Sequence, residues 1–308
     1  MPDLLTELRE ACTTVARRAG HVRVNEGAIP GYAASLQGSR IASGPQQDVH
    51  LSSGTREQVA AYWLTLDAIN FGSGWFPTLR KLEGRSGYDT VAQGLRDRFE
   101  RAGHWPAAAL AKISTSEVAA VLAQDPGHEL IGLFARSLRD LGQRVADDHA
   151  GSFAAVVDVA GQSATELVNQ LAQWQCFNDV SLYDDLRLAF LKRAQIAAAD
   201  IHRAGLVGFA DLGRLTMFAD NLVPHVLRLD GVLEFERTLV ARIERGELIE
   251  HDSPEEVEIR ACAVHAVELL TSARPGLTAA EIDQELWLRG RGGRYKALPR
   301  HRSRCTAY

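Results

Sequence analysis

Residues 253–272, SPEEVEIRACAVHAVELLTS, contain the signals that predict the fold class of this chain. The Ser253 hydroxyl can accept a hydrogen bond from a backbone N–H of a first helical turn, and Glu256 completes a capping pattern three residues later. Pro254 suits the first helical position, where its missing N–H would have no partner in any case. An apolar-periodic run follows. The stretch therefore predicts a helix over 254–272.

The same capping signature comes just ahead of other apolar-periodic runs. It occurs at Thr55-x-x-Gln58, Ser114-x-x-Glu117, Ser163-x-x-Glu166 and Thr278-x-x-Glu281. Together with the apolar periodicity it predicts helices over 3–19, 56–69, 89–102, 115–124, 128–148, 164–175, 184–204, 209–219, 221–229, 233–246, 254–272 and 279–289.

Evidence for strands is thin and lies near the N-terminus. Val22–Asn25 and Asp48–Leu51 each alternate over only a few positions, which is enough for short strands. Residues 27–47, which separate them, are rich in Gly, Ala and Ser and are predicted to form a loop. The fold class is therefore predicted to be all-α, with room for a small β element near the N-terminus.

Length and composition are those of an ordinary globular protein, with 308 residues of which 46% are hydrophobic and 24% charged. We expect one domain over residues 1–308, built as a single body or as two closely packed helical lobes. No run of about 18 apolar residues is present, so a transmembrane helix is excluded. The first residues lack a signal-peptide pattern. The four cysteines are far apart in the sequence, which indicates reduced thiols. A cytoplasmic location is expected.

The net charge of −5 argues against a nucleic-acid polymer as partner, because phosphate neutralisation usually requires a basic surface. The only strongly basic stretch is the last twenty residues, which still leaves a small phosphorylated ligand open. The chain has no GxxxxGK[ST], GxGxxG, HExxH or GxSxG motif. Its ten histidines do not group at metal-ligand spacing, so no metal is expected.

Residues 66–77, LDAINFGSGWFP, form the first segment that is unlike a core helix. Glycines allow backbone N–H groups to approach a ligand, and aromatic faces suit a flat base. Asp67, Asn70, Phe71 and Trp75 are therefore candidates for substrate binding. A helix C-cap followed by a hydrophobic anchor loop explains the segment equally well.

Two further segments place charges among apolar residues. Lys192, in FLKRAQI (190–196), can hold a phosphate, although an isolated lysine of this kind more often extends its head into water. Asp220, in FADNLVPH (218–225), would be costly as an unpaired buried carboxylate. It either caps the helix that follows or faces a polar pocket, and the residues alone favour the cap modestly.

The fourth segment combines EIDQELW (281–287) with the tail PRHRSR (299–304). Glu281 and Asp283 lie early in a helix, where carboxylates favour the positive end of the helix dipole. The tail has the ordinary interpretation of a solvated basic terminus. Asp283, His301 and Arg302 nevertheless become candidates once the four segments are considered together.

Taken jointly, the segments resemble the queuosine 5′-phosphate N-glycosylase/hydrolase (queuosine salvage) family over roughly residues 10–308. The matching pieces are LDAINFGSGWFP (66–77), SGY (86–88), FLKRAQIAAAD (190–200), TMFADNLVPHVLR (216–228), EEVEIRA (255–261), IDxxLW (282–287) and YKALPRHRSR (295–304). The resemblance implies a monomeric, mostly helical protein with a core like that of helix-hairpin-helix DNA glycosylases. Such a protein cleaves queuosine 5′-monophosphate with water, yielding queuine and ribose 5-phosphate. No metal or organic cofactor is implied.

The resemblance also implies that His50, Phe218, Asp220 and Asp283 surround the queuine base. Lys192 and the tail cations are candidates for the phosphate on charge alone. Some family members carry an aromatic residue and an acid where this chain has Gln284 and Leu288. Those two positions are candidates for contact with the aminomethyl-cyclopentenediol arm.

Chemistry assigns roles to these residues. Cleavage of an N-glycoside builds positive charge on the ribose, so we assign Asp220 to the sugar as transition-state stabiliser, nucleophile or water-activating base. Asp283 is assigned to the N1–H and exocyclic amine of the guanine-like edge, and Phe218, with Phe71 or Trp75, to stacking. The alternatives are a glycosylase acting on DNA or RNA bases and a non-catalytic nucleotide-binding helical module. An enzyme needs Asp220 in the pocket, whereas a binding module needs it only as a cap.

Overall fold

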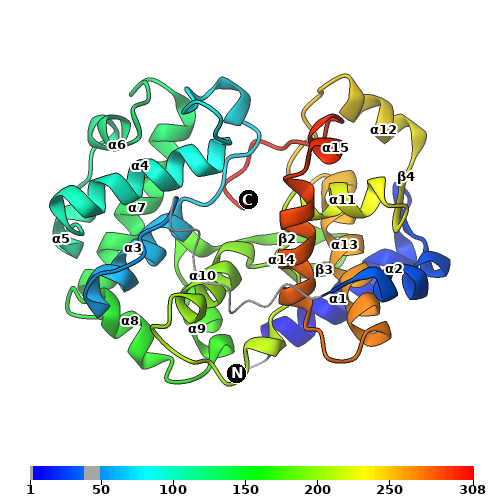
Figure 1. The fold of residues 1–308 in the computed structure, drawn as a ribbon, viewed down its shortest axis with the longest axis horizontal. Coiled ribbons are helices and arrows are strands. Elements are labelled where there is room, and N and C mark those ends of the chain that lie inside the picture. Colours follow the sequence, from blue (N-terminus) through cyan, green and yellow to red (C-terminus); the bar gives the residue numbers. More distant parts are fainter. Residues whose placement is uncertain (1–2, 38–48) are drawn as a thin grey trace.

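Helices dominate the computed structural model, which describes residues 3–37 and 49–308 (Figure 1). The helices are α1 (Leu4–Arg18), α2 (Ile29–Ser35), α3 (Arg56–Ala68), α4 (Gly87–Ala102), α5 (Ala107–Leu110), α6 (Thr115–Leu122), α7 (Glu129–Asp148), α8 (Phe153–Val159), α9 (Ala164–Leu171), α10 (Lys192–Arg203), α11 (Val223–Leu229), α12 (Arg237–Glu244), α13 (Pro254–Ala273), α14 (Ala279–Gly290) and α15 (Gly293–Lys296). The strands are β1 (Val22–Val24), β2 (Val180–Tyr183), β3 (Leu186–Ala189) and β4 (Leu233–Phe235). The predicted fold class is confirmed.

Two hydrophobic cores divide the helices into two lobes, which lie side by side in Figure 1. The first lobe contains α3 to α10 and packs around buried residues such as Trp63, Phe134 and Leu167. The second lobe contains α1, α2 and α11 to α15, and its core includes Val15, Leu227 and Val264. The second lobe is therefore assembled from two separate parts of the sequence, whereas the first is nearly continuous.

The central helix of the second lobe is α13, the stretch with the clearest sequence signal. Ser253 accepts a hydrogen bond from the N–H of Glu256, and Pro254 occupies the first turn, as the capping pattern predicted. Helix α1 packs along α13, and the buried Glu258 accepts hydrogen bonds from the N–H groups of His21 (2.6 Å) and Val22 (3.0 Å). These bonds fix the N-terminal helix and β1 against a helix far along the chain.

The small β element near the N-terminus is confirmed, because β1 pairs antiparallel with β4, from Val22 opposite Phe235 to Val24 opposite Leu233. The predicted strand at 48–51 is wrong over Val49–Leu51, which form no strand, while residue 48 lies outside the described residues. The predicted loop at 27–47 is wrong over α2, whose Ile29 and Ala33 are buried one turn apart against the second core.

Two predicted helices, 184–204 and 233–246, begin as strands. Strand β3 forms a hairpin with β2, pairing Val180 with Ala189 and Tyr183 with Leu186. Helix α10 starts only at Lys192, after Leu191 turns the chain with a left-handed φ of 50°. Strand β4 likewise precedes α12. In both places the apolar periodicity continues from the strand into the helix, so it did not show where the helix begins.

The predicted helix at 209–219 is also wrong, and this affects the site. After one short 3-10 turn (Leu212–Arg214) the chain runs without regular structure to the start of α11. Side chains take the N–H groups that a helix would use: the N–H of Thr216 donates to Gln195 Oε1 (2.8 Å) and that of Phe218 to Asp283 Oδ1 (3.0 Å). Phe218 and Asp220 are therefore carried by a non-helical segment.

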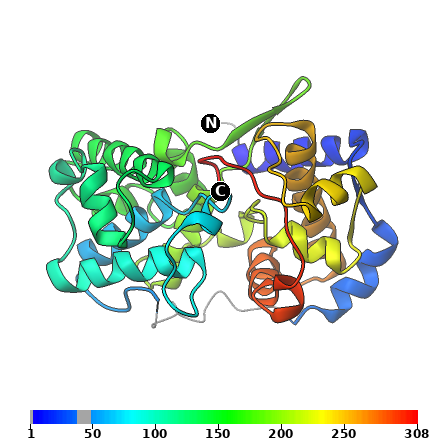
Figure 2. The same cartoon turned by 90° about the horizontal axis from the view of Figure 1, so that it is seen from above.

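The chain beyond α15 crosses from the second lobe back to the first, which Figure 2 shows in red. The carbonyl of Arg302 accepts from the N–H of Ile249 (2.9 Å), and the carbonyl of Tyr308 accepts from the N–H of Gly72 (2.9 Å). A side chain at Gly74 would collide with the carbonyl of Ser303. We call residues 297–308 the tail; it closes one side of the space between the lobes. None of the described helices is both long and apolar enough to cross a membrane.

Candidate active site

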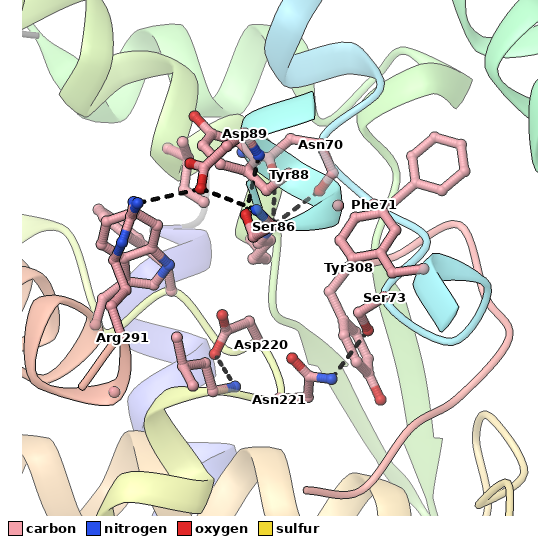
Figure 3. A pocket seen from close by; sticks show the side chains of 18 of the residues that line it. Asn70, Phe71, Ser73, Ser86, Tyr88, Asp89, Asp220, Asn221, Arg291 and Tyr308 are labelled. Carbon is pink, nitrogen blue, oxygen red and sulfur yellow. Dashed lines mark hydrogen bonds and ion pairs between the residues drawn. The ribbon is translucent and has the colours of Figure 1, made fainter. Parts of the chain in front are cut away.

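A cavity of about 560 Å³ lies where the two lobes and the tail meet, a size suited to a small-molecule ligand. Its lining comes from the loop after α3, the start of α4, one face of α10, the segment before α11, helix α14 and the tail. Figure 3 shows Asn70 and Phe71 of the loop, Tyr88 and Asp89 of α4, and Asp220 facing one another across this space.

Most of the candidate residues from the sequence come together in this cavity. Its lining includes His50, Asn70, Phe71, Lys192, Phe218, Asp220, Asp283 and Arg302. Gln284 and Leu288, the two positions that differ from some family members, line it as well. Three candidates lie outside the lining: Asp67, Trp75 and His301.

Those three residues lie behind the residues that line the cavity. Asp67 is fully buried behind Asn70, whose Nδ2 donates to Asp67 Oδ1 at 3.4 Å; burial and the nearby Asp200 charge raise the pKa of Asp67 well above its usual range. Trp75 donates its indole N–H to Glu129 Oε2 (2.7 Å). Burial lowers the pKa of His301 to about 3, so its ring is uncharged at neutral pH. His301 is thus unsuited to the phosphate role that its charge suggested.

Asp283 and Phe218 hold each other in the lining. The buried Asp283 accepts the N–H of Phe218, and burial, with the Asp220 charge adding to it, raises the pKa of Asp283 well above its usual range. The capping function at this helix start belongs to Glu281, whose side chain accepts from Thr278 N–H at 2.8 Å. Asp283 is therefore free of the helix-end role that sequence alone allowed it.

Asp220 combines the two roles between which the sequence could not decide. Its Oδ1 accepts from the N–H groups of Leu222 (2.8 Å) and Val223 (3.0 Å) at the start of α11, and its side chain also lines the cavity. Because Oδ1 makes both capping bonds, the carboxylate is held in a fixed orientation. A fixed carboxylate in a cavity wall can act electrostatically on a bound ligand.

Lys192 is the cation deepest in the site, and its head is not in water. Only 5% of the residue is exposed, and Nζ donates to the carbonyl (2.8 Å) and Oδ1 (3.3 Å) of Asn70. Burial lowers the pKa of Lys192 to about 8, against the opposing effect of the Asp220 carboxylate. Lys192 and Asp220 therefore lie in the same cavity lining, where the charge of Asp220 favours the protonated lysine.

The tail adds two arginines, Arg300 and Arg302. Burial lowers the pKa of Arg300, again against the charge of Asp220. Within the described residues, no protein group makes a hydrogen bond or ion pair with either guanidinium. Two guanidinium groups in the cavity lining are suited to an anionic ligand group.

Several lining residues were not singled out from the sequence. Asp200 pairs with Arg203 (2.6 Å), whose Nη2 donates to Gln284 Oε1 (3.2 Å) across the lobes. Asn221 donates to Ser73 Oγ (3.0 Å), a bond drawn in Figure 3. Asp200 and Asn221 lie inside motifs that carried the family resemblance. The motifs could therefore have identified them, whereas no chemical argument from the sequence did.

His50 and Tyr88 form a second polar contact in the lining, with Nε2 and the phenol oxygen 2.9 Å apart. Tyr88 belongs to the SGY motif, and its neighbour Asp89 pairs with Arg291 of α14 at 3.1 Å (Figure 3). Both lobes thus contribute hydrogen-bonding groups to the same cavity.

One group in the described part of the chain has the spacing of metal ligands: His251, Asp252 and Glu256, whose ligand atoms lie within 4.8 Å of one another. The group is outside the cavity lining. Glu256 already faces His251 (3.4 Å) and Arg260 (3.8 Å), so its charge is balanced by protein cations. We assign no metal to it.

Comparison with known proteins gives one consistent result. The family model described as queuosine salvage protein matches residues 49–308. A Sphaerobacter thermophilus protein called queuosine 5′-phosphate N-glycosylase/hydrolase is 37% identical over 275 residues, which cover 85% of each chain. Proteins of that name from Dictyostelium discoideum (30% identical; 82% of this chain, 79% of the relative) and Bos taurus (28% identical; 100% of both) are also similar.

Proposed function

The chain belongs to the queuosine salvage protein family, and we propose that it hydrolyses the N-glycosidic bond of queuosine 5′-phosphate, releasing queuine and ribose 5-phosphate. In this reaction the bond between the anomeric carbon and the base nitrogen breaks, and its electron pair leaves with the base. Water supplies the hydroxyl of the anomeric carbon and, in net balance, the proton of the base. The chain is accordingly an N-glycosidase.

The base subsite consists of Phe218, Phe71 and Asp283. The phenyl rings offer flat faces to the base. Asp283, when ionised, accepts from the N1–H and exocyclic amine of the guanine-like edge, two donors that match the two oxygens of a carboxylate. Because Phe218 and Asp283 are joined through the Phe218 N–H, stacking and edge recognition share one rigid support.

Asp220 acts on the sugar. Bond cleavage creates positive charge on the ribose, and an ionised carboxylate held beside it stabilises that charge more in the transition state than in the ground state. A 7-deazapurine has no N7 to protonate, so base departure depends on donors to its remaining edge atoms. The fixed orientation of Asp220 means that little reorganisation accompanies the reaction.

We assign the 5′-phosphate to Arg300 and Arg302 of the tail and to Lys192. All three line the same cavity as Asp220, whose charge acts on Lys192 and on Arg300. Binding energy from the phosphate, which does not react, can hold the ribose over Asp220. A preference for the nucleotide over the nucleoside follows.

The observation that carries the proposal is that the carboxylates Asp220 and Asp283 line one cavity together with the cations Lys192 and Arg300. The decisive experiment is incubation of the protein with queuosine 5′-monophosphate, followed by chromatographic detection of free queuine. Absence of queuine from a folded, queuine-binding preparation would refute the activity.

We further propose that the chain acts as a monomer on the free nucleotide and not on a nucleic-acid polymer, in keeping with its net charge of −5. Queuosine-containing tRNA, offered in place of the nucleotide, should release no queuine. Sedimentation analysis across a range of concentrations should give the mass of a single chain.

A further inference from the structure

Arg260 of α13 lies outside the cavity, is fully buried, and belongs to the EEVEIRA motif, to which the proposed reaction assigns no role. Its Nε donates to the carbonyl of Ala219 (3.0 Å), and its Nη2 donates to both carboxylate oxygens of Asp179 (2.9 and 2.7 Å). The guanidinium lies over the ring of Phe190 at 4.0 Å and that of Tyr308 at 4.7 Å.

Each of these contacts leads to a different part of the site. Ala219 directly precedes Asp220 in the chain. Asp179 Oδ2 also accepts the N–H of Lys192 at 3.0 Å, where α10 begins. Tyr308 belongs to the tail that carries Arg300 and Arg302. One guanidinium therefore connects the three segments that hold the sugar carboxylate, the buried lysine and the phosphate cations.

We infer that Arg260 is a positioning residue, which fixes the separation between Asp220 and Lys192 by holding the carbonyl of Ala219 directly and the N–H of Lys192 through Asp179. This inference rests on the proposed function. The guanidinium of Arg260 has five N–H donors in a rigid plane, which suits it to hold two segments in a defined relative orientation. A lysine can reach one partner but cannot hold two segments in this way.

The base subsite is held by other bonds, which makes the inference separable from a general effect on folding. Phe218 is fixed through Asp283, and the preceding Thr216 through Gln195. A change at Arg260 should therefore disturb the sugar and phosphate groups more than the base groups. Queuine binding then reports an intact pocket, while turnover reports the alignment of Asp220.

The test compares Arg260→Lys with Glu258→Gln in the purified full chain. Glu258 is a matched control: it is also buried and charged on α13, but its bonds lead to Gly20, His21, Val22 and Tyr183, away from the cavity. Calorimetry with queuine gives the concentration of sites that bind queuine. The kcat for queuosine 5′-monophosphate is then calculated from that concentration of binding sites. Melting temperature is recorded for each variant.

We expect Arg260→Lys to lower kcat per queuine-binding site by roughly 10- to 100-fold, the scale of a small misalignment of reacting groups. Its queuine affinity should stay within about threefold of the parent, since the base subsite is held independently. Glu258→Gln should lower the melting temperature while kcat per site stays at the parent value. Parental kcat per site in Arg260→Lys would overturn the inference.

If Arg260→Lys does not fold, Asp179→Asn decides the question. Asparagine keeps the shape and an acceptor for the Lys192 N–H, but it removes the charge that anchors Arg260. Lower kcat per site is again expected, and parental kcat per site again overturns the inference. Failure of the parent itself to release queuine while binding it would instead refute the proposed reaction.

Discussion

At the scale of single residues, the site depends on carboxylates whose roles are set by their partners. Asp220 has two backbone N–H partners and cationic neighbours, whereas Asp283 has one N–H partner and is deeply buried beside Asp220. The sequence identified both residues but left each with a helix-end alternative. In the structure Asp220 accepts N–H groups at the start of α11, whereas Asp283 accepts the N–H of Phe218 from a distant segment, a contact that the sequence could not show.

Replacing Asp220 by Asn should separate capping from catalysis. Asparagine caps helices about as well as aspartate, so the melting temperature should change little. Loss of the charge should lower kcat by roughly 10²-fold or more. Steady-state kinetics and thermal denaturation on the same preparation measure both effects, and near-parental turnover in the folded variant would contradict the assignment to the sugar.

Asp283 should make queuine binding depend on pH. Burial raises its pKa well above the usual range, so in the empty cavity the carboxyl stays protonated to a higher pH than an exposed aspartate. It must be ionised to accept two N–H donors, and queuine affinity should therefore increase as pH rises through that pKa and weaken below it. Calorimetry across the acid-to-neutral range measures this dependence.

The control for this dependence is Asp283→Asn, which cannot ionise. Its queuine affinity should be weaker by about 1–3 kcal/mol, because a donor replaces an acceptor opposite the base edge. Its affinity should also lose the dependence on pH that the parent shows. Equal pH dependence in the two proteins would assign the titration to another group.

At the scale of elements, the sequence predicted helices well where capping was local. Thr55 with Gln58, Ser114 with Glu117, and Thr278 with Glu281 all form complete capping boxes. Prediction failed where a distant side chain satisfied the backbone, as Gln195 does for Thr216 in the segment before α11. Periodicity within a short window contains no information about such a partner, so the conformation of the segment that carries Phe218 and Asp220 was not predictable.

Gln195 should accordingly stabilise that segment. Gln195→Ala leaves the N–H of buried Thr216 without its acceptor, and we expect the free energy of unfolding to fall by about 1–3 kcal/mol. Denaturant unfolding measures the change. The exposed Gln143, whose side chain donates to Asp147, provides a control whose substitution should cost less than about 0.5 kcal/mol.

At the scale of the whole molecule, the cavity exists only because two lobes and the tail meet. The tail brings its arginines into the lining of the cavity that holds Asp220, and Gly74 permits the crossing because a side chain there would strike the backbone of Ser303. The sequence marked the tail as basic and the glycine-rich loop as unusual. The sequence did not show that the tail and the glycine-rich loop are in contact, because local sequence patterns carry no information about residues so far apart.

Gly74→Ala should therefore displace the tail and weaken phosphate recognition. We expect kcat/KM for queuosine 5′-monophosphate to fall roughly tenfold, with a smaller change for the free nucleoside, because only the nucleotide uses Arg300 and Arg302. Gly132→Ala is the control, since an added methyl group there has nothing within 4 Å. An unchanged ratio of the two substrates in Gly74→Ala would separate the tail from phosphate binding.

The divided second lobe has a consequence for the order of folding. The first lobe is nearly continuous in sequence, so all of it is synthesised before the second lobe is complete and it can form first. Helix α1 and β1 can pack only after α13 has been synthesised, because Val22 and its partner Glu258 are 236 positions apart. During synthesis the N-terminal helix thus stays without its partner while the first lobe condenses. Pulsed hydrogen exchange should find amides of α3 and α7 protected before those of α1, so that the second lobe is completed only after the first.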